Sequence, residues 1–185
     1  MILPIYTYGQ PVLREATGTV EKDYPDLKKL VGDMFETMYK ADGVGLAAPQ
    51  VGLSIRLLVL DADSISKKHP ECKGFKRVMV NPVITERSKE TVSLEEGCLS
   101  FPGIHEKVSR AAKIKVTYQD EDFNEHTEEF SNFCARVVQH ECEHLEGHVF
   151  IDNISPIRRQ LNKGKLNSLI KGTTSCDYKI KPVKK

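Results

Sequence analysis

The stretch His140-Glu141-Cys142-Glu143-His144 constrains the fold of this chain more than any other. Two histidines four residues apart lie on one face of an α-helix, about one turn from each other, so both rings can reach one divalent metal ion. A glutamate directly after the first histidine can then act on water beside the metal without being a ligand. The pattern therefore favours a metal hydrolase. The alternative is an amphipathic helix whose histidines serve only packing.

Length and composition indicate one globular domain. The chain has 185 residues, of which 39% are hydrophobic and 29% charged, enough for one sizeable core. No apolar run approaches the roughly 20 residues that span a bilayer, and the N-terminus lacks the basic and apolar regions of a signal peptide. Five cysteines, an odd number without regular spacing, argue against a disulfide framework. We therefore expect a cytoplasmic protein with no membrane contact.

The charge is distributed unevenly along the chain. Residues 156–185 carry nine Lys and Arg against Asp177, a net charge of +8, whereas the rest of the chain carries −7. We therefore expect a single catalytic domain, residues 1–155, followed by a basic C-terminal helix and tail, residues 156–185. A basic tail on an acidic body favours a polyanionic partner such as nucleic acid. A solvated tail that only keeps the protein in solution explains the charge equally well.

Hydrophobic spacing predicts the main elements. Helices are expected at 26–39, 132–146 and 157–170, and strands at 55–60, 77–84, 113–118 and 126–130. Pro82 should push its strand to a sheet edge or a bulge. These elements predict an α+β fold, with antiparallel or mixed sheets packed around the central HExxH helix and with an N-terminal and a C-terminal helix.

A catalytic metal ion needs a third protein ligand and an open position for water. Phe150 stands where one large class of metalloproteases places a third histidine after His144. The downstream carboxylates Glu146, Asp152 and Asp177 follow no clear helix that could present them. A zincin-type metallopeptidase is therefore disfavoured, and we expect the third ligand upstream.

Two upstream segments carry suitable chemistry. Cys98 lies between an acidic pair and a proline-containing turn, where a metal ion would deprotonate its thiol; a small buried packing cysteine is the alternative. Residues 43–52 contain GxGxxA, but this pattern follows a helix and precedes a strand, which excludes a dinucleotide-binding loop. The segment can instead bring backbone groups and the Gln50 amide close to a small substrate.

Three motifs in this order resemble the signature motifs of the peptide deformylase family: GVGLAAPQ at 43–50, EGCLS at 96–100 and QHECEH at 139–144. The segment GQPVLR at 9–14 is also similar to the start of that family, and the resemblance extends to Pro156. The chain departs from the family pattern at Glu143, where the family usually has Asp. We expect Glu143 to form a structural pair with Arg110.

The resemblance implies the residues of the metal site. Cys98, His140 and His144 would hold one divalent metal ion with water at the fourth position. The metal of the family is typically Fe²⁺, although Zn²⁺, Ni²⁺ and Co²⁺ can occupy such a site, and a Cys/His₂ set by itself suggests zinc. Glu141 would take a proton from water and return it to the leaving amine.

The resemblance also implies the substrate, which is the N-formyl group on the methionine of a nascent polypeptide, released as formate. The Gln50 amide and the Leu99 N–H would stabilise the developing oxyanion together with the metal. The substrate-binding residues would be Val44, Gly45, Gly97, Phe133, Arg136 and Val137. Because nascent chains emerge from the ribosome, the basic tail is expected to contact ribosomal RNA. A degenerate member of the family that binds formyl peptides without turnover is a further alternative.

Overall fold

The computed structural model describes residues 1–183. Within this range the α-helices are α1 (Leu27–Lys40), α2 (Asn132–Leu145), α3 (Pro156–Leu161) and α4 (Lys163–Lys171). The strands are β1 (Ile5–Tyr6), β2 (Gly45–Ala47), β3 (Leu57–Asp61), β4 (Lys76–Arg87), β5 (Thr91–Gly97), β6 (His105–Ala111), β7 (Lys113–Gln119), β8 (Glu125–Ser131) and β9 (Ile180–Lys181). The α+β fold expected from the sequence is confirmed.

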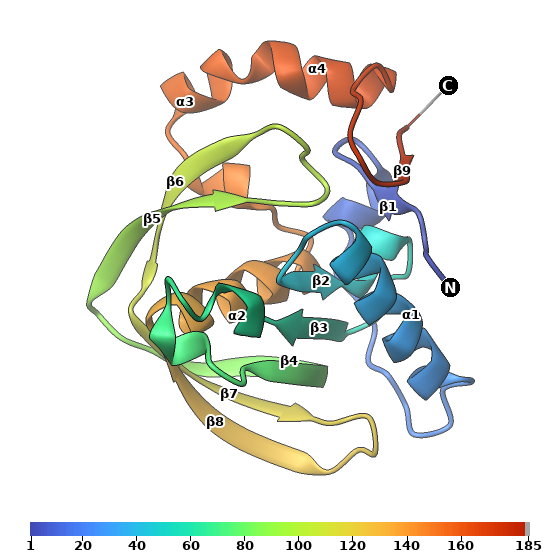
Figure 1. Cartoon of the computed structure of the whole chain (residues 1–185), viewed down its shortest axis with the longest axis vertical. Helices are drawn as coiled ribbons and strands as arrows, with labels where there is room; N and C mark the ends of the chain where they lie inside the picture. The colour runs from blue at the N-terminus through green and yellow to red at the C-terminus, as the bar shows by residue number, and fades with distance from the viewer. Residues whose placement is uncertain (184–185) are drawn as a thin grey trace.

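Five strands form an antiparallel sheet in the order β2-β3-β4-β7-β8 (Figure 1). Strand β3 is an apolar run without alternation because both of its faces are buried. Leu58 and Leu60 belong to the hydrophobic cluster that contains the apolar side chains of α2. Leu57 and Val59 point to the other face and join the cluster around α1. The two helices therefore cover opposite faces of the sheet.

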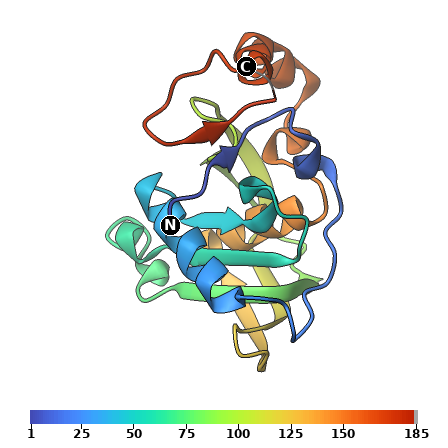
Figure 2. The ribbon, with the colours of Figure 1, turned by 90° about the vertical axis from the view of Figure 1, so that its right-hand side faces the viewer.

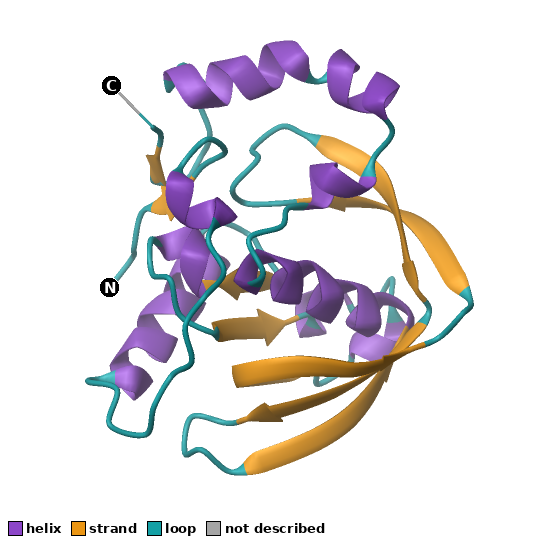
Figure 3. Cartoon of the chain, turned by 180° about the vertical axis from the view of Figure 1, so that it is seen from behind, coloured by secondary structure: helices purple, strands orange, loops and turns teal. Residues whose placement is uncertain are grey.

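Helix α2 lies between this sheet and the antiparallel hairpin β5–β6 (Figures 1 and 3). Eleven of its 14 residues are buried, and they include Arg136, His140, Glu141 and His144. Polar side chains buried in this way cost free energy unless they find partners. The hairpin supplies several of those partners, and these contacts hold together the candidate site.

The β5–β6 hairpin was not expected from the sequence. The buried positions of β6 are Glu106, Val108 and Arg110, so the usual alternation of apolar and polar residues is absent. In the sheet, β4 is an inner strand rather than an edge strand. Its register shifts between Val80 and Val83, at Pro82. The expectation of a bulge is therefore confirmed, and the edge alternative is wrong.

The single C-terminal helix expected at 157–170 is in fact two helices, α3 and α4, which meet at Asn162. The amide of Asn162 is buried and donates to Glu106 Oε1 at 2.6 Å, which fixes the break. Leu166 and Leu169 of α4 pack in a cluster with apolar residues of the hairpin. Figure 3 shows α3 and α4 alongside that hairpin.

The two ends of the described chain lie side by side, because β1 and β9 pair in parallel (Figure 2). Ile5 is opposite Ile180 and Tyr6 is opposite Lys181. The division of the chain at residue 155 stays a prediction, and Lys184 and Lys185 of the basic tail lie outside the described residues. Across residues 1–183, no helix combines the length and apolar character that crossing a membrane requires.

Candidate metal centre and active site

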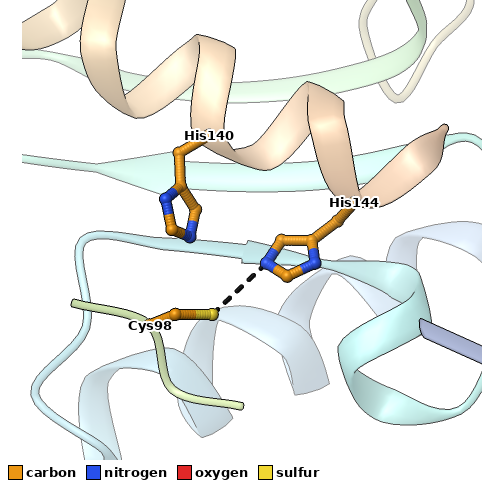
Figure 4. Close-up of side chains that lie close together, drawn as sticks. All are labelled: Cys98, His140 and His144. Atoms are coloured by element: carbon orange, nitrogen blue, oxygen red, sulfur yellow. Dashed lines mark hydrogen bonds between the residues drawn. The ribbon is translucent and has the colours of Figure 1, made fainter. Parts of the chain in front are cut away.

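His140 and His144 extend from one face of α2 toward Cys98, which directly follows β5 (Figure 4). The Nε2 atom of His144 lies 3.3 Å from Cys98 Sγ. One ligand atom from each of the three residues lies within 4.8 Å of the others. A thiolate and two imidazole nitrogens grouped in this way suit a divalent transition metal ion. The structure therefore brings the three expected ligand residues together.

Glu96, near the end of β5, orients the first histidine. The Nδ1–H of His140 donates to Glu96 Oε1 at 2.8 Å, which leaves Nε2 directed at the sulfur of Cys98. Arg110 donates to the same carboxylate at 2.6 and 2.9 Å, and Arg136 also donates to it. Burial alone would raise the pKa of Glu96, but the hydrogen bonds from His140 and Arg110 outweigh burial and lower the pKa to about 2. The carboxylate is therefore ionised.

The two histidines differ in their protonation. Burial would lower the pKa of His140, but its contacts with Cys98 and Glu96 outweigh burial and raise the pKa well above the usual value. Burial lowers the pKa of His144 well below the usual value, and the neighbouring His140 lowers it further. His144 is therefore a neutral imidazole with a free lone pair. A metal ion bound here would have to displace the proton of His140.

Glu141 lies in the same cavity as Cys98 and His140. Its Oε2 atom is buried and has no hydrogen-bond partner within residues 1–183. Burial raises the pKa of this carboxyl to about 7. A Cβ atom on Gly45 would lie 2.5 Å from Glu141 Oε1, so the carboxylate fits only because this position is glycine. A buried, unpaired carboxyl that titrates near neutrality is suited to proton transfer.

Gln50 is held in a fixed orientation in the short 3-10 helix Ala48–Val51. Its Oε1 accepts the N–H of Ala47 at 2.8 Å, so its NH₂ group points the other way. That group lies 3.4 Å from Cys98 Sγ and 3.3 Å from Ser100 Oγ. The amide donor of Gln50 therefore lies beside the candidate metal ligand Cys98.

The cavity in front of these residues has a volume of about 490 Å³. Its lining includes Val44, Gly45, Gly97 and Leu99 from the expected set, together with Cys98, His140 and Glu141. Three other expected residues lie elsewhere among the described residues. The ring of Phe133 stacks on His69 with centroids 4.2 Å apart, Val137 packs in the core, and the guanidinium of Arg136 binds Glu96 and the carbonyls of Val92 and Val108.

The expected pair between Glu143 and Arg110 is confirmed. Arg110 Nη1 lies 2.9 Å from Glu143 Oε1, and the amide of Asn153 donates to the same carboxylate at 3.1 Å. Arg110 therefore joins Glu143 on α2 to Glu96 on β5. Among the described residues, the group of possible metal ligands consists of Cys98, His140 and His144 and does not include Glu143.

Sequence reasoning missed two contributions to the site. Glu96 was treated only as an acidic neighbour of Cys98, although a charged residue at a buried position of a strand signals a buried ion pair. Cys176, Asp177 and Tyr178 also line the cavity, and no local pattern marks them. They reach it through the pairing of β9 with β1, which joins the two ends of the chain.

Cys98, His140 and His144 group as one set of metal-ligand atoms, and the unpaired Glu141 lies in the cavity that Cys98 and His140 line. This arrangement defines a metal-dependent hydrolase of the HExxH type, with a cysteine upstream of the helix as the third ligand. The sequence profile described as polypeptide deformylase matches residues 2–160. The chain belongs to the polypeptide deformylase family and is a metal-dependent hydrolase that removes N-formyl groups.

Full-length relatives agree with this assignment. The chain is 46% identical to a peptide deformylase of Flavobacterium psychrophilum, with 100% of this chain and 99% of the relative covered. It is 44% identical to a peptide deformylase of Cytophaga hutchinsonii, with both chains fully covered at 100%. The crystal structure of peptide deformylase from Thermotoga maritima superimposes with a TM-score of 0.76 at 44% identity, covering 84% of this chain and 99% of the other. Peptide deformylase 1B of Arabidopsis thaliana gives a TM-score of 0.82 at 36% identity, covering 92% of each chain.

Proposed function

We propose that this enzyme removes the formyl group from the N-terminal methionine of newly made polypeptides and releases formate. One observation carries the assignment of roles: the unpaired, buried carboxylate of Glu141 shares a cavity with Cys98 and His140. In the reaction, water adds to the formyl carbon, the C–N bond breaks, and the leaving amine gains a proton. The products are formate and a peptide with a free amino terminus.

Cys98, His140 and His144 would hold the metal ion, and their geometry fits one. We propose Fe²⁺, by the family resemblance, with Zn²⁺, Ni²⁺ or Co²⁺ as alternatives that the same donors accept. When bound, a divalent cation in this group supplies Lewis acidity, which makes water acidic enough to attack near neutral pH. Glu96 would hold His140 in the orientation that binding requires.

Glu141 would act as the general base and then as the general acid. Its carboxylate takes a proton from the attacking water and passes it to the nitrogen of the leaving amine, and this exchange typically contributes about 10²–10⁴-fold in rate. The pKa of about 7 supports this role, because the group can both accept and return a proton near neutrality. Gly45 leaves the space that the carboxylate needs.

Gln50 and Leu99 would stabilise the negative charge that develops on the formyl oxygen. The NH₂ group of Gln50 is fixed beside Cys98, and Leu99, which lines the cavity, directly follows that cysteine. One donor of this kind is typically worth about 10²–10³-fold in rate. Donors that are fixed in advance need no reorganisation during the reaction, which is the source of this gain.

The backbone of Val44, Gly45 and Gly97 would bind the peptide beside the cavity, and a wall of glycine leaves room for hydrogen, but little for carbon, on the acyl group. For the methionine side chain, the family correspondence points to Val44 and to Phe133, Arg136 and Val137. The last three of these residues precede His140 on α2. The role of all four stays a prediction.

The decisive experiment follows one formylmethionyl peptide and measures both formate release and cleavage of internal peptide bonds. Formate release alone supports the deformylase, internal cleavage supports a zincin-type peptidase, and binding without either product supports an inactive member. Glu141→Ala should retain the metal ion and lose most of kcat. A Glu141→Ala variant with near-native turnover would exclude Glu141 as the base.

We further propose that the enzyme works in the cytoplasm, where the basic C-terminal segment contacts ribosomal RNA through phosphates. Lys163 and Lys171 are exposed and suit this contact, whereas Lys165 donates to the carbonyl of Gly103 at 2.9 Å and serves the fold.

The test is ribosome co-sedimentation of the double variant Lys163→Glu and Lys171→Glu at several salt concentrations. The matched control reverses the exposed Lys67 and Lys68 of the body. Binding through phosphates weakens steeply with salt. Equal sedimentation of both variants would exclude docking through the tail.

A further inference from the structure

The last described segment returns to the catalytic cavity from outside the region that defines the family. The family profile ends at residue 160, yet residues 176–178 line the cavity together with Gly45 and Glu141. Pairing of β9 with β1 holds the segment there (Figure 2). The chain therefore closes one side of its site with residues that the shared motifs do not include.

Tyr178 makes the direct contact between this segment and the catalytic residues. Its hydroxyl donates to the carbonyl oxygen of Leu99 at 2.8 Å, across 79 positions of sequence. Burial raises the pKa of this phenol, so the hydroxyl keeps its proton and stays a donor at any working pH. The contact reaches the residue directly after Cys98.

The hydrogen bonds of the loop after β5 show what Tyr178 contributes. The carbonyl of Cys98 accepts the N–H of Phe101 at 2.9 Å, and the carbonyl of Ser100 accepts the N–H of Tyr8 at 3.0 Å. The carbonyl of Leu99, between them, accepts the hydroxyl of Tyr178. Each of the three consecutive carbonyls is thus fixed, and the middle one is fixed by the C-terminal segment.

The same segment also supports the neighbouring contact. The N–H of Thr7 donates to the carbonyl of Lys181 at 3.2 Å, and the side chain of Gln10 donates to the carbonyl of Pro182 at 2.7 Å. Tyr8, which holds Ser100, lies between Thr7 and Gln10. The C-terminal segment therefore braces the loop twice, directly at Leu99 and indirectly through the N-terminal strand.

We propose that Tyr178 is a positioning residue for deformylation and that residues 176–178 form a wall of the substrate cavity. The first part rests on the proposed function, in which the N–H of Leu99 is an oxyanion donor. A displacement of about 1 Å at a reacting group can cost about 10²-fold in rate, and the loss of one hydrogen bond next to the donor should cost about tenfold. The loss should fall on kcat, because the donor acts on charge that develops only in the transition state.

The test compares the full-length wild-type enzyme with Tyr178→Phe and with Tyr39→Phe. The control removes the same group from Tyr39, an exposed residue of helix α1 whose hydroxyl donates to Asp61 at 2.6 Å. Steady-state formate release is measured on a formylmethionyl tripeptide, together with bound metal per chain and the unfolding temperature. Tyr178→Phe should lower kcat about tenfold, with KM within about twofold and metal content unchanged. Tyr39→Phe should match the wild type.

The outcomes separate this inference from the proposed function. A wild-type enzyme that releases no formate contradicts the function, whatever Tyr178 does. An active wild type with an unchanged kcat in Tyr178→Phe overturns the positioning role. A fall in kcat with an equal loss of metal or a collapse of the unfolding temperature also overturns it, because the role would then be structural.

A second measurement needs no variant and tests the wall. The metal-loaded wild type is alkylated with iodoacetamide, with and without the methionyl tripeptide product, and modification of Cys176 is followed by mass spectrometry. Cys176 is partly exposed and lines the cavity, whereas Cys72, Cys134 and Cys142 are buried and serve as internal references. Product at ten times its Kd should slow alkylation of Cys176 about tenfold. An unchanged rate would overturn the wall, even if Tyr178→Phe failed to fold.

Discussion

Replacing Glu96 by alanine should remove the polar contacts that join helix α2 to the hairpin β5–β6. The Glu96 carboxylate accepts hydrogen bonds from Arg110, Arg136 and the Nδ1–H of His140. The side chains of the two arginines are only 3% and 4% exposed, so water cannot replace the lost acceptor. Arg110 retains Glu143, and Arg136 retains two backbone carbonyls. In the variant, the positive charges of Arg110 and Arg136 would thus stay buried with fewer hydrogen-bond acceptors and less negative charge around them.

The size of the effect follows from this partial compensation. Breaking a buried ion pair by removing one partner costs about 3–5 kcal/mol, and the remaining contacts favour the lower end of that range. A loss of about 3 kcal/mol should lower the unfolding temperature by roughly 6–12 °C in a chain of this size. Because Glu96 also orients His140, the affinity for the metal should fall about 10–100-fold. The two losses have different causes and are measured separately.

The assay uses urea unfolding of the metal-free protein and chelator competition for the metal-loaded protein. Glu95→Ala is the matched control, because it removes an exposed carboxylate from the adjacent position of the same strand; it should change stability by less than about 0.5 kcal/mol. Glu96→Gln keeps the shape and one acceptor and should fall between Glu96→Ala and the wild type. If the free energy of unfolding of Glu96→Ala lies within about 1 kcal/mol of the wild-type value and the variant binds metal equally well, Glu96 does not join α2 to the hairpin in this way.

Three further predictions concern other parts of the site. Gly45→Ala should lower kcat about 10²-fold in steady-state assays, because the added Cβ displaces Glu141 by its 2.5 Å contact; unchanged kcat would contradict that contact. Glu143→Ala should lower the unfolding temperature in calorimetry and reduce kcat only in proportion to lost metal, since its carboxylate pairs with an arginine. The hydrogen bonds from Arg158 lower the pKa of Glu106, so this pair stabilises α3 and α4 above pH about 4.3 and loses its effect as the pH falls. Amide hydrogen exchange in α3 and α4, corrected for its intrinsic dependence on pH, should then become faster below that pH. The acceleration should be smaller in Glu106→Gln, which has no carboxylate to protonate at this position.

The sequence predicted the elements in which local periodicity and burial agree. Helices α1 and α2 have apolar residues at helical spacing, and the strands β3, β4, β7 and β8 follow strand-length apolar or alternating runs. The ligand residues could also be predicted, because two of them are one helical turn apart and Cys98 lies in a recognisable motif. In each case the signal is contained within a few consecutive residues.

The other parts of the fold and of the site depend on contacts between residues far apart in the sequence. Such contacts leave no local signal. The hairpin β5–β6 could not be predicted from alternation, because Glu96, Glu106 and Arg110 occupy buried positions where apolar residues are expected. Glu96 and Arg110 are tolerated because they pair with each other across the hairpin and find further partners on α2. Glu106 pairs with Arg158 of α3. The break at Asn162 likewise depends on Glu106, which is 56 positions away. Tyr178 contacts Leu99 where the pairing of β1 and β9 brings the two ends of the chain together.

The ion pairs around α2 distinguish Glu141 from the other charged side chains of this helix. Arg136 is paired with Glu96, and Glu143 is paired with Arg110, so these charged side chains of the helix are compensated by the hairpin. Glu141 is different, because one oxygen of its carboxylate is buried and has no partner among residues 1–183. An unsatisfied buried group of this kind costs about 1–3 kcal/mol, and its place in the cavity supports the proposed role of Glu141 in proton transfer. The fold therefore compensates the charges of Arg136 and Glu143 and leaves uncompensated the carboxyl of Glu141, which lines the cavity and is the group that the proposed mechanism uses to exchange a proton.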